Sequence, residues 1–337
     1  MSVDVLFVCP SSSLKAYQAL SAKYSAVEPP TWALLLAEAM RSFEFVPAIL
    51  DINAEKLSVA ESVDRIQVVN PRLVCLVVYG QNPNSGTVNM VGAVEVAEAI
   101  KSRGIGLPIS IVGSHVSALP LEVLNNEHAI DIVFCNEGVY SLKNLLGSDL
   151  SRNDSISKVK GIGYRKGGEA VLTEPQKVVP QKDIDSHLPG YAWDLLPYDE
   201  KPLDLYRSHF WHAEYNHDNR TPFAAIYTSL GCTFRCSFCM INMLNRDDNV
   251  EIGVASNYAT MRFWSPEHVF QQIRDLYDIG VRTLRFSDEM FLLNRKYFGT
   301  FILFFLKTSL DSSLFMASAD ASIPECVYGI LSISSIL

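Results

Sequence analysis

The sequence predicts an α/β protein, with a doubly wound first domain followed by a second βα domain. Two observations predict this fold. Short apolar runs alternate with amphipathic stretches over residues 3–147, and the same alternation returns from residue 223. Strands that alternate with helices form parallel sheets, because each helix crosses one face of the sheet before the next strand begins. A length of 337 residues is sufficient for two such domains.

Five parallel strands are expected in the first domain, because five apolar runs are bounded by turn residues. They are residues 3–8, 45–50, 73–78, 109–112 and 130–134, with helices centred near Leu35, Val63, Val94, Val123 and Leu142. Ligands of such sheets bind beyond the carboxyl ends of the strands. The expected binding wall is therefore formed by the loops at residues 10–30, 79–87, 113–120 and 136–138.

Residues 151–220 are expected to connect the two domains. Residues 157–174 predict a hairpin whose turn is Lys166-Gly167-Gly168. Residues 175–220 are rich in Pro, Asp, His and aromatic residues without sustained periodicity, which is typical of a linker. We therefore expect a first domain at residues 1–150, a hairpin and linker at 151–220, and a second domain at 221–337.

The second domain repeats the alternation of strand and helix. Ser265 provides an N-cap for the first of its helices. The expected strands are residues 223–228, 281–286 and 314–317, and the expected helices are residues 266–277, residues 297–307 and a third one near Pro324.

Composition and charge exclude several kinds of partner. The chain has 28 Lys and Arg against 37 Asp and Glu, a net charge of −9, and it lacks the basic clusters that bind phosphates, so no nucleic acid is expected. The most apolar stretch, residues 301–306, is shorter than the roughly 20 residues of a membrane helix. Residues 1–9 have no basic region typical of a signal peptide. We expect a cytoplasmic protein without a membrane partner.

The most informative segment is TSLGCTFRCSFCM. Cys232, Cys236 and Cys239 follow a predicted strand with CxxxCxxC spacing. Three thiolates on one loop can turn toward one point, and thiolates bind iron–sulfur clusters, zinc or Cu(I). Three cysteines leave one iron of a four-iron cluster open for a substrate, whereas a structural zinc site normally takes a fourth Cys or His.

The sequence leaves two alternatives to the iron–sulfur cluster. One is a zinc site completed by His209, His212 or His217, and the other is three unrelated cysteines. The spacing, the preceding strand and Phe238 favour the cluster. The three histidines could instead line a substrate cavity, or be exposed or hydrogen-bonded residues of the linker.

The cysteine motif resembles the signature of the radical S-adenosylmethionine (SAM) superfamily, CxxxCx(aromatic)C after the first strand of a (βα) barrel. The three cysteines and Phe238 occupy every position of that signature. The resemblance implies that Cys232, Cys236 and Cys239 bind a 4Fe-4S cluster whose open iron binds SAM. It also implies that Phe238 packs near the adenine, and that reduction cleaves SAM to a 5′-deoxyadenosyl radical.

Two further features bear on the barrel. Ser287, Asp288 and Glu289 follow its second expected strand, at the position of the family's SAM-binding polar motif, and the resemblance implies the same role for them. Residues 223–337 hold about half of the βα units of a family barrel. The sequence therefore predicts a partial (βα) barrel and a chain that is apparently truncated.

The first domain is similar to the Rossmann-like cobalamin-binding domain of cobalamin-dependent radical SAM enzymes. The run IVGSHVSALPLEVLNNEHAIDIVFCNEG resembles that class's fourth strand, loop and fifth strand, although Asn136 stands where the family's turn begins with Gly. The glycines would let the backbone approach the cofactor, but they also fit tight turns. The resemblance implies that cobalamin is bound by Tyr79, Gly80, Gln81, Asn82, Thr87, Gly113, Ser114, His115, Glu137 and Gly138.

Two other motifs bear on which cofactor the first domain binds and how. The cobalt-binding pattern DxHxxG is present from Asp185 to Gly190, but it lies in the linker, so we interpret His187 as a linker residue. Residues 10–18, where that motif belongs, contain no His, and cobalamin would therefore bind without a protein histidine on cobalt. A dinucleotide site is disfavoured because no GxGxxG follows Val8.

The combined resemblance implies a cobalamin-dependent radical SAM enzyme, and favours a methyltransferase that acts on an unactivated carbon. Its substrate would be a small molecule or a peptide, and its electron donor a protein such as flavodoxin or ferredoxin. Two alternatives stay open. One is a radical cyclase or rearrangement enzyme built from the same parts, and the other is a non-catalytic cobalamin carrier or sensor.

Overall fold

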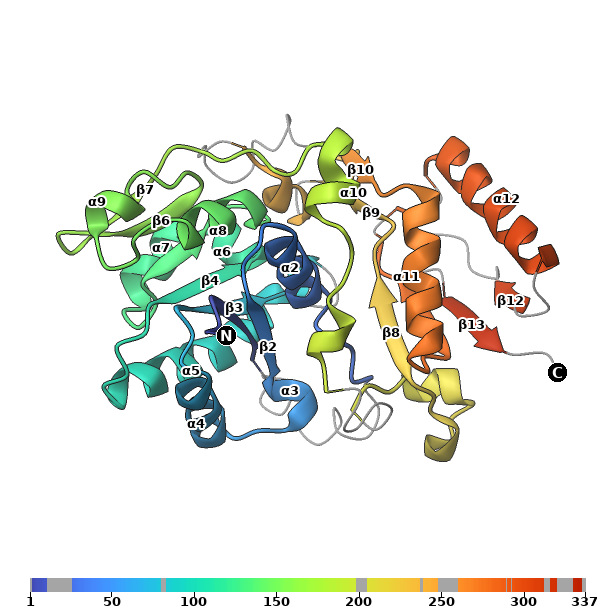
Figure 1. The fold of residues 1–337 in the computed structure, drawn as a ribbon, viewed down its shortest axis with the longest axis horizontal. Coiled ribbons are helices and arrows are strands. Elements are labelled where there is room, and N and C mark those ends of the chain that lie inside the picture. The colour runs from blue at the N-terminus through green and yellow to red at the C-terminus, as the bar shows by residue number, and fades with distance from the viewer. Residues whose placement is uncertain are drawn as a thin grey trace.

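A computed structural model provides the structure of the chain, and Figure 1 shows two α/β halves side by side. The structure describes residues 2–10, 26–79, 83–197, 205–236, 239–247, 260–288, 290–291, 293–311, 316–319 and 330–334.

A sheet of seven strands forms the first half, in the order β2-β1-β3-β4-β5-β6-β7. Its first five strands are parallel, and they confirm the five predicted strands with ends that differ by a residue or two. They are β1 (Val5–Cys9), β2 (Pro47–Asp51), β3 (Leu73–Val78), β4 (Ile109–Gly113) and β5 (Ile132–Phe134). The order reverses between β1 and β3, which is where doubly wound sheets bind their ligands.

Helices cover both faces of this sheet and bury two separate apolar cores. Residues of one strand alternate between the cores: Val5 and Phe7 face one, and Leu6 and Val8 face the other. The first core is covered by α2 (Thr31–Ser42) and α8 (Val139–Leu146), and the second by α4 (Val59–Val69), α5 (Met90–Ser102) and α7 (Pro120–Asn126). The short helices are α3 (Ile52–Glu55), α6 (Ser114–Ala118) and α9 (Asn153–Ile156).

The predicted hairpin consists of β6 (Ile162–Lys166) and β7 (Glu169–Leu172). The sequence placed it with the linker, but β6 pairs antiparallel with β5, with Phe134 opposite Ile162. The hairpin therefore extends the first sheet. It covers an edge of β5 that would otherwise leave backbone groups unpaired. Arg165 strengthens this arrangement by donating to the carbonyl oxygens of Leu124, Glu127 and Ile130.

The second half begins with β8 (Phe223–Ile226) and β11 (Thr283–Phe286), which pair in parallel and are connected by α11 (Pro266–Asp278). The Ser265 hydroxyl accepts a hydrogen bond of 3.3 Å from the His268 N–H, which confirms the predicted N-cap. On the outer side of this sheet Phe286 packs with Phe301 of α12 (Arg295–Asp311). This is the strand, helix, strand order of a βα barrel.

The remaining strands differ from the expected barrel order. A third parallel strand would lie beside β11, but β13 (Ile330–Ser334) occupies that position and runs antiparallel to β11. β12 (Met316–Ala319), near the expected third strand, pairs with β13, so the sheet order is β12-β13-β11-β8. The helix expected near Pro324 lies outside the described residues.

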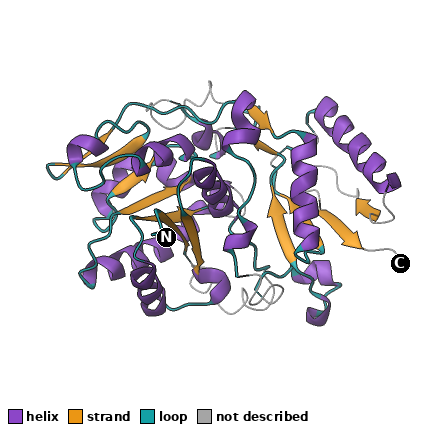
Figure 2. Cartoon of the chain, viewed as in Figure 1, coloured by secondary structure: helices purple, strands orange, loops and turns teal. Residues whose placement is uncertain are grey.

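A short ribbon of β9 (Ser229–Gly231) and β10 (Met261–Phe263) lies beside this sheet, and the linker runs between the two halves (Figure 2). The linker contains the short helix α10 (Ile184–His187), and the residues after it contact both halves. The Ala192 N–H donates to Leu34 of α2, and the Trp264 indole donates to the Leu188 carbonyl. In the described part of the chain, no helix is both long and apolar enough to span a membrane.

Candidate functional site

The strand that leads into the cysteine loop is fixed by Asp288, at the end of β11. This buried carboxylate accepts hydrogen bonds from the N–H groups and the hydroxyls of both Thr228 and Ser229, at 2.6 to 3.1 Å. Burial raises the pKa of the carboxyl, while the hydrogen bonds oppose that rise. Because Thr228 and Ser229 lie between β8 and Cys232, Asp288 sets the starting point of the cysteine loop.

The three cysteines lie on the one segment that follows β9, but they differ in solvent exposure. Cys232 is buried directly after β9, Cys236 is exposed and Cys239 is half-buried, and none forms a disulfide. The Cys232 thiol accepts from the Phe234 N–H at 3.4 Å, and the Cys239 N–H donates to the Cys236 carbonyl at 3.1 Å. Three cysteines outside disulfides on one anchored loop are a donor set that fits an iron–sulfur cluster.

The described residues include no group of three His, Cys, Asp or Glu side chains already arranged around a metal position. Phe238, the aromatic position of the motif, lies outside the described residues.

Gly231 determines how the chain approaches the cysteine loop. It has a φ of +90°, and a Cβ there would meet the Thr260 carbonyl at 2.3 Å, so only glycine fits where the chain before β10 passes.

His209, a possible fourth zinc ligand, has both ring nitrogens occupied. Its Nδ1 accepts from the Ala26 N–H at 3.2 Å, so in the neutral ring Nε2 carries the proton and donates to Glu28 at 3.3 Å. The ring is buried and stacks on Trp211. His209 is therefore a hydrogen-bonded linker residue. The side chains of His212 and His217 lie outside the described part of the chain.

Ser287 and Asp288, the expected SAM-binding residues, lie together at the end of β11. The Ser287 N–H donates to Ile226 at 2.8 Å, and its hydroxyl accepts from the Arg285 guanidinium at 3.2 Å. Arg285 in turn forms a two-fold ion pair of 2.7 Å with Glu28, which precedes α2. Both candidates therefore lie beside the start of the cysteine loop, and Glu289 lies outside the described residues.

Tyr79 lies at the carboxyl end of β3, where the order of the first sheet reverses. Its ring stacks on Trp32 with 4.5 Å between centroids and 10° between planes. Its buried hydroxyl has no hydrogen-bond partner in the described part of the chain. Burial raises the pKa of this phenol well above its usual value. An unpaired buried hydroxyl at the switch point fits a ligand that carries amide or phosphate groups, as cobalamin does.

Four other candidates lie at or after the ends of β3 and β4. Thr87 and His115 share a hydrogen bond of 3.0 Å, and burial lowers the pKa of the His115 imidazole. A Cβ on Gly113 would meet the Val78 carbonyl at 2.0 Å, so close packing of β3 against β4 already requires this glycine. Ser114 is buried. Gly80, Gln81 and Asn82 lie outside the described residues.

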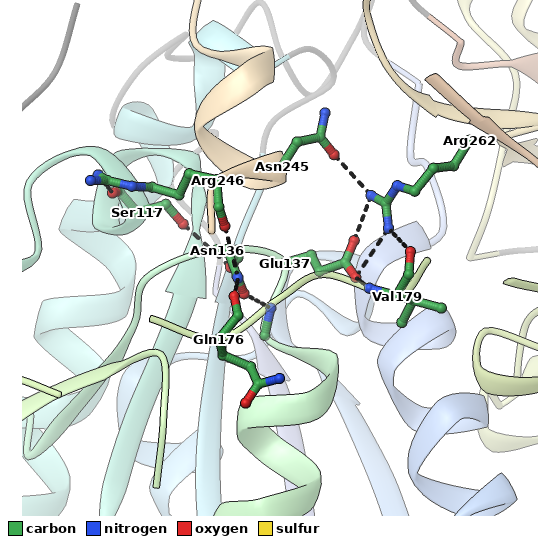
Figure 3. Close-up of polar contacts among 9 residues, drawn as sticks. Ser117, Asn136, Glu137, Gln176, Val179, Asn245, Arg246 and Arg262 are labelled. Atoms are coloured by element: carbon green, nitrogen blue, oxygen red, sulfur yellow. Dashed lines mark hydrogen bonds and ion pairs between the residues drawn. The ribbon is translucent and has the colours of Figure 1, made fainter. Parts of the chain in front are cut away.

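The loop after β5 contacts the second half through Asn136, as Figure 3 shows. The Asn136 amide nitrogen donates to the carbonyls of Gln176 at 2.7 Å and Arg246 at 3.1 Å, and its amide oxygen accepts from the Gly138 N–H at 3.0 Å. The Arg246 guanidinium donates to the Ser117 carbonyl at 3.3 Å. This position, where the family pattern has glycine, uses its side chain to join the two halves.

Glu137 is buried, and its carboxylate is fully engaged within the protein. Arg262 of β10 pairs with it at 2.7 Å, and the Val179 N–H donates to it at 2.7 Å. The Glu137 N–H donates to the Leu244 carbonyl at 3.1 Å. Arg262 and Asn245, which share a further hydrogen bond of 2.8 Å, were not found from the sequence. Glu137 and Arg262 are 125 residues apart, so no local pattern joins them.

The linker motif from Asp185 to Gly190 has a structural role. The His187 imidazole shares a hydrogen bond of 2.7 Å with the Tyr140 hydroxyl of α8 and lies 5.3 Å from the Phe43 ring. A Cβ on Gly190 would meet the Gln272 amide at 2.6 Å. The interpretation of His187 as a linker residue therefore agrees with its contacts.

A cavity of about 530 Å³ lies away from these residues, at the amino ends of β3, β4 and β5. Three charged residues of its lining are already in ion pairs, Lys101 with Asp131 at 2.7 Å and Arg72 with Asp4 at 2.8 Å, and Asp149 accepts hydrogen bonds from Ser151. Ligands of parallel sheets bind at the opposite, carboxyl edge. The cavity is therefore not the candidate site.

The carboxyl edge of the first sheet and the cysteine segment meet at two places. One is the contact of the loop after β5 with η6 (Ile241–Asn245), a 3-10 helix that follows the cysteines, and the other is Trp32, which lies 6.2 Å from the Tyr227 ring after β8. The fold and the site thus define a doubly wound parallel sheet whose carboxyl edge contacts the segment that carries the three cysteines.

Comparison with known proteins finds one matching family model and several similar proteins. Residues 17–146 match the family model of the B12 binding domain. The chain is 27% identical over 269 residues to an uncharacterized methyltransferase of Pyrococcus horikoshii, and 27% identical over 146 residues to the cobalamin-dependent radical SAM methyltransferase TokK of Streptomyces tokunonensis. These matches cover 80% and 43% of this chain, respectively. The first half therefore matches a B12 binding domain, and the chain is similar to proteins that include a cobalamin-dependent radical SAM methyltransferase.

A solved structure shares the fold. The radical SAM methyltransferase TsrM of Kitasatospora setae, determined with tryptophan and a SAM analog, superposes with a TM-score of 0.58 and 16% identity over 91% of this chain. The chain spans about half the length of two of these proteins, 50% of the Pyrococcus protein and 51% of TsrM, and the match to TokK covers 19% of TokK.

Proposed function

We propose that this chain binds cobalamin, a 4Fe-4S cluster and SAM, cleaves SAM reductively and methylates an unactivated carbon. The observation that carries the proposal is the meeting of the cysteine segment with the carboxyl edge of the first sheet, through Glu137, Leu244 and Asn136. TokK and TsrM, to which the chain is similar, are both radical SAM methyltransferases, and TsrM has been solved with cobalamin and a [4Fe-4S] cluster.

The proposed cluster ligands are Cys232, Cys236 and Cys239. Asp288 accepts hydrogen bonds from the N–H groups of Thr228 and Ser229 just before them, and so fixes the point where the loop begins. Phe238 is proposed to pack against the adenine of SAM, and Ser287 and Glu289 to contact its polar groups. When bound, these cofactors supply one-electron chemistry and a transferable methyl group.

The proposed cobalamin site is the carboxyl edge of the first sheet. There the unpaired Tyr79 hydroxyl would bind a polar group of the cofactor, and the Trp32 ring fixes the Tyr79 ring by stacking. Thr87, which is exposed, and His115, which is half-buried at the start of α6, supply further polar groups after β3 and β4. The remaining proposed contacts come from Gly80, Gln81, Asn82, Gly113, Ser114 and Gly138.

The partners follow from the same chemistry. A reductive cleavage needs single electrons, so we propose a low-potential donor protein such as flavodoxin or ferredoxin. The substrate is proposed to be a small molecule or a peptide. We propose a cytoplasmic location, because free thiols such as Cys236 persist in reducing compartments.

The test is anaerobic reconstitution of the wild-type chain with iron and sulfide, followed by cobalamin and SAM. We expect a brown protein with a four-iron cluster, retained cobalamin and 5′-deoxyadenosine formed on reduction. Cys236→Ala should abolish the cluster, whereas Cys75→Ala, which changes a buried thiol of β3, should retain it. A wild-type protein without iron and labile sulfide would contradict the proposal.

A cobalamin carrier without catalysis is the second candidate. It is favoured by the family match, which lies entirely within the first half of the chain at residues 17–146. A carrier would retain cobalamin tightly but release no 5′-deoxyadenosine. Product mass separates the remaining enzyme alternative, because a methyltransferase adds a methyl group, whereas a cyclase or rearrangement enzyme does not.

A further inference from the structure

Four residues form a buried polar cluster between the two halves, which we call the Glu137 clamp: Glu137, Val179, Asn245 and Arg262 (Figure 3). The Glu137 and Arg262 side chains are 1% and 7% exposed. The guanidinium donates to both carboxylate oxygens, to the Val179 carbonyl at 2.6 Å and to the Asn245 amide oxygen at 2.8 Å. The Val179 N–H completes the cluster by donating to Glu137 at 2.7 Å.

Stability alone does not explain a buried ion pair at this place. Removing two charges from water is costly, and apolar side chains of similar volume often stabilise a protein as much or more. A charged pair with directed hydrogen bonds instead selects one arrangement of the parts that it joins. The planar guanidinium of Arg262 is suited to this role, because its donors point in fixed directions.

The clamp holds the cysteine loop on both sides. Arg262 of β10 lies opposite Leu230 of β9. Leu230 is two residues before Cys232, so Arg262 contacts the segment that leads into the cysteine loop. Asn245 ends η6, which follows Cys239. Glu137 follows β5 at the carboxyl edge of the first sheet, next to the N-terminus of α8. Through Arg262, the Glu137 carboxylate therefore connects the segments before and after the three cysteines to the edge where cobalamin is proposed to bind.

We propose that Glu137 and Arg262 are positioning residues that fix the distance and orientation between the cysteine loop and the carboxyl edge of the first sheet. This inference rests on the proposed function for the identity of the two cofactors, but not for the contact itself. It gives Glu137 a role different from the cobalamin contact expected from the sequence, because Arg262 and Val179 already occupy its carboxylate.

The first test needs no cofactor. Hydrogen exchange is compared in the wild-type chain, Glu137→Gln and the control Asp131→Asn, which loses a pair with Lys101 at the amino edge. We expect Glu137→Gln to speed exchange of β9, β10 and η6 by about tenfold, and to leave β1 and β3 unchanged. Asp131→Asn should leave β9, β10 and η6 unchanged. Unchanged exchange of these three elements in Glu137→Gln would overturn the proposal.

The second test uses the loaded protein and electron paramagnetic resonance. Cobalamin in its cobalt(II) state and a reduced iron–sulfur cluster both carry unpaired electrons, so their magnetic coupling reports their separation. We expect Glu137→Gln to bind both cofactors at wild-type amounts but to show a weaker, more widely distributed coupling. Asp131→Asn should match the wild type. A wild-type coupling in Glu137→Gln, or a selective loss of cobalamin, would overturn the proposal.

A milder variant keeps the test decisive if Glu137→Gln does not fold. Arg262→Lys keeps the positive charge but cannot reproduce the two-fold contact. It should show the same changes in exchange and coupling to a smaller degree, and unchanged values would overturn the proposal. A wild-type chain that binds neither cofactor would contradict the proposed function, while the exchange experiment would still test the clamp.

Discussion

Asp51, which ends β2 beside Cys9, is a buried carboxyl whose protonation depends on the fold. Burial raises its pKa to about 6, although the Ala54 N–H and the Tyr206 hydroxyl donate to it and oppose the rise. A folded pKa above the ordinary value of 3.8 means that the folded state binds the proton more tightly than the unfolded chain. This contribution to stability is therefore complete at low pH and is lost as the pH rises from about 4 to about 6.

We predict that Asp51→Asn removes this dependence. The free energy of unfolding of the variant, relative to wild type, should rise by up to ~3 kcal/mol between pH 4 and pH 7, because the amide carries no charge to bury. Urea unfolding at several pH values measures the difference. Parallel stability curves for the two proteins across this range would contradict the raised pKa.

Asp288 gives a second prediction at the scale of one residue. Asp288→Asn replaces an acceptor by an amide nitrogen facing the donors of Thr228 and Ser229, and each unpaired buried group costs about 1–3 kcal/mol. We expect lower stability and less iron per chain after reconstitution. The exposed Asp278→Asn is the control. Full iron content with loss of SAM cleavage alone would instead favour a direct SAM contact.

The N-terminal ends of helices are stabilised by local capping hydrogen bonds, and the contribution of a cap to the free energy of unfolding can be measured in each half. Ser58 caps α4 in the first half, where it forms a reciprocal pair of hydrogen bonds with Glu61, and Ser265 caps α11 in the second. We predict that Ser58→Ala and Ser265→Ala each cost about 1 kcal/mol in denaturant unfolding. Ser265→Asp should retain stability, because aspartate also caps a helix. An effect of Ser265→Asp equal to that of alanine would contradict this explanation.

At the scale of elements, most strands and helices were predictable because their signals are local. The apolar run of β3 and the cap of α11 each lie within a few consecutive residues. The place of the β6 hairpin was not predictable, because its sequence forms a hairpin equally well alone or beside β5. The position of β13 between β11 and β12 likewise depends on pairing between distant segments.

At the scale of the whole molecule, buried ion pairs such as Glu137 with Arg262 join the two halves and contribute to the stability of the fold. We predict that Arg262→Met costs ~3–5 kcal/mol of unfolding free energy, because it leaves the Glu137 charge buried and unpaired. The double variant Glu137→Leu with Arg262→Met should recover most of that loss. Denaturant unfolding of both single variants and the double variant measures the coupling. Additive losses would show that the two charges do not act on each other.

The sequence by itself determined the α/β class, the five parallel strands and the cysteine motif, because periodicity and spacing are properties of neighbouring residues. It also indicated the carboxyl edge as the binding side, since that follows from the parallel arrangement. Only the tertiary structure decided which partners Glu137 and Asp288 have, and that the buried Tyr79 hydroxyl has none in the described part of the chain. Those partners come from segments far apart in the chain, and burial between them sets the energy of each charge and each hydrogen bond.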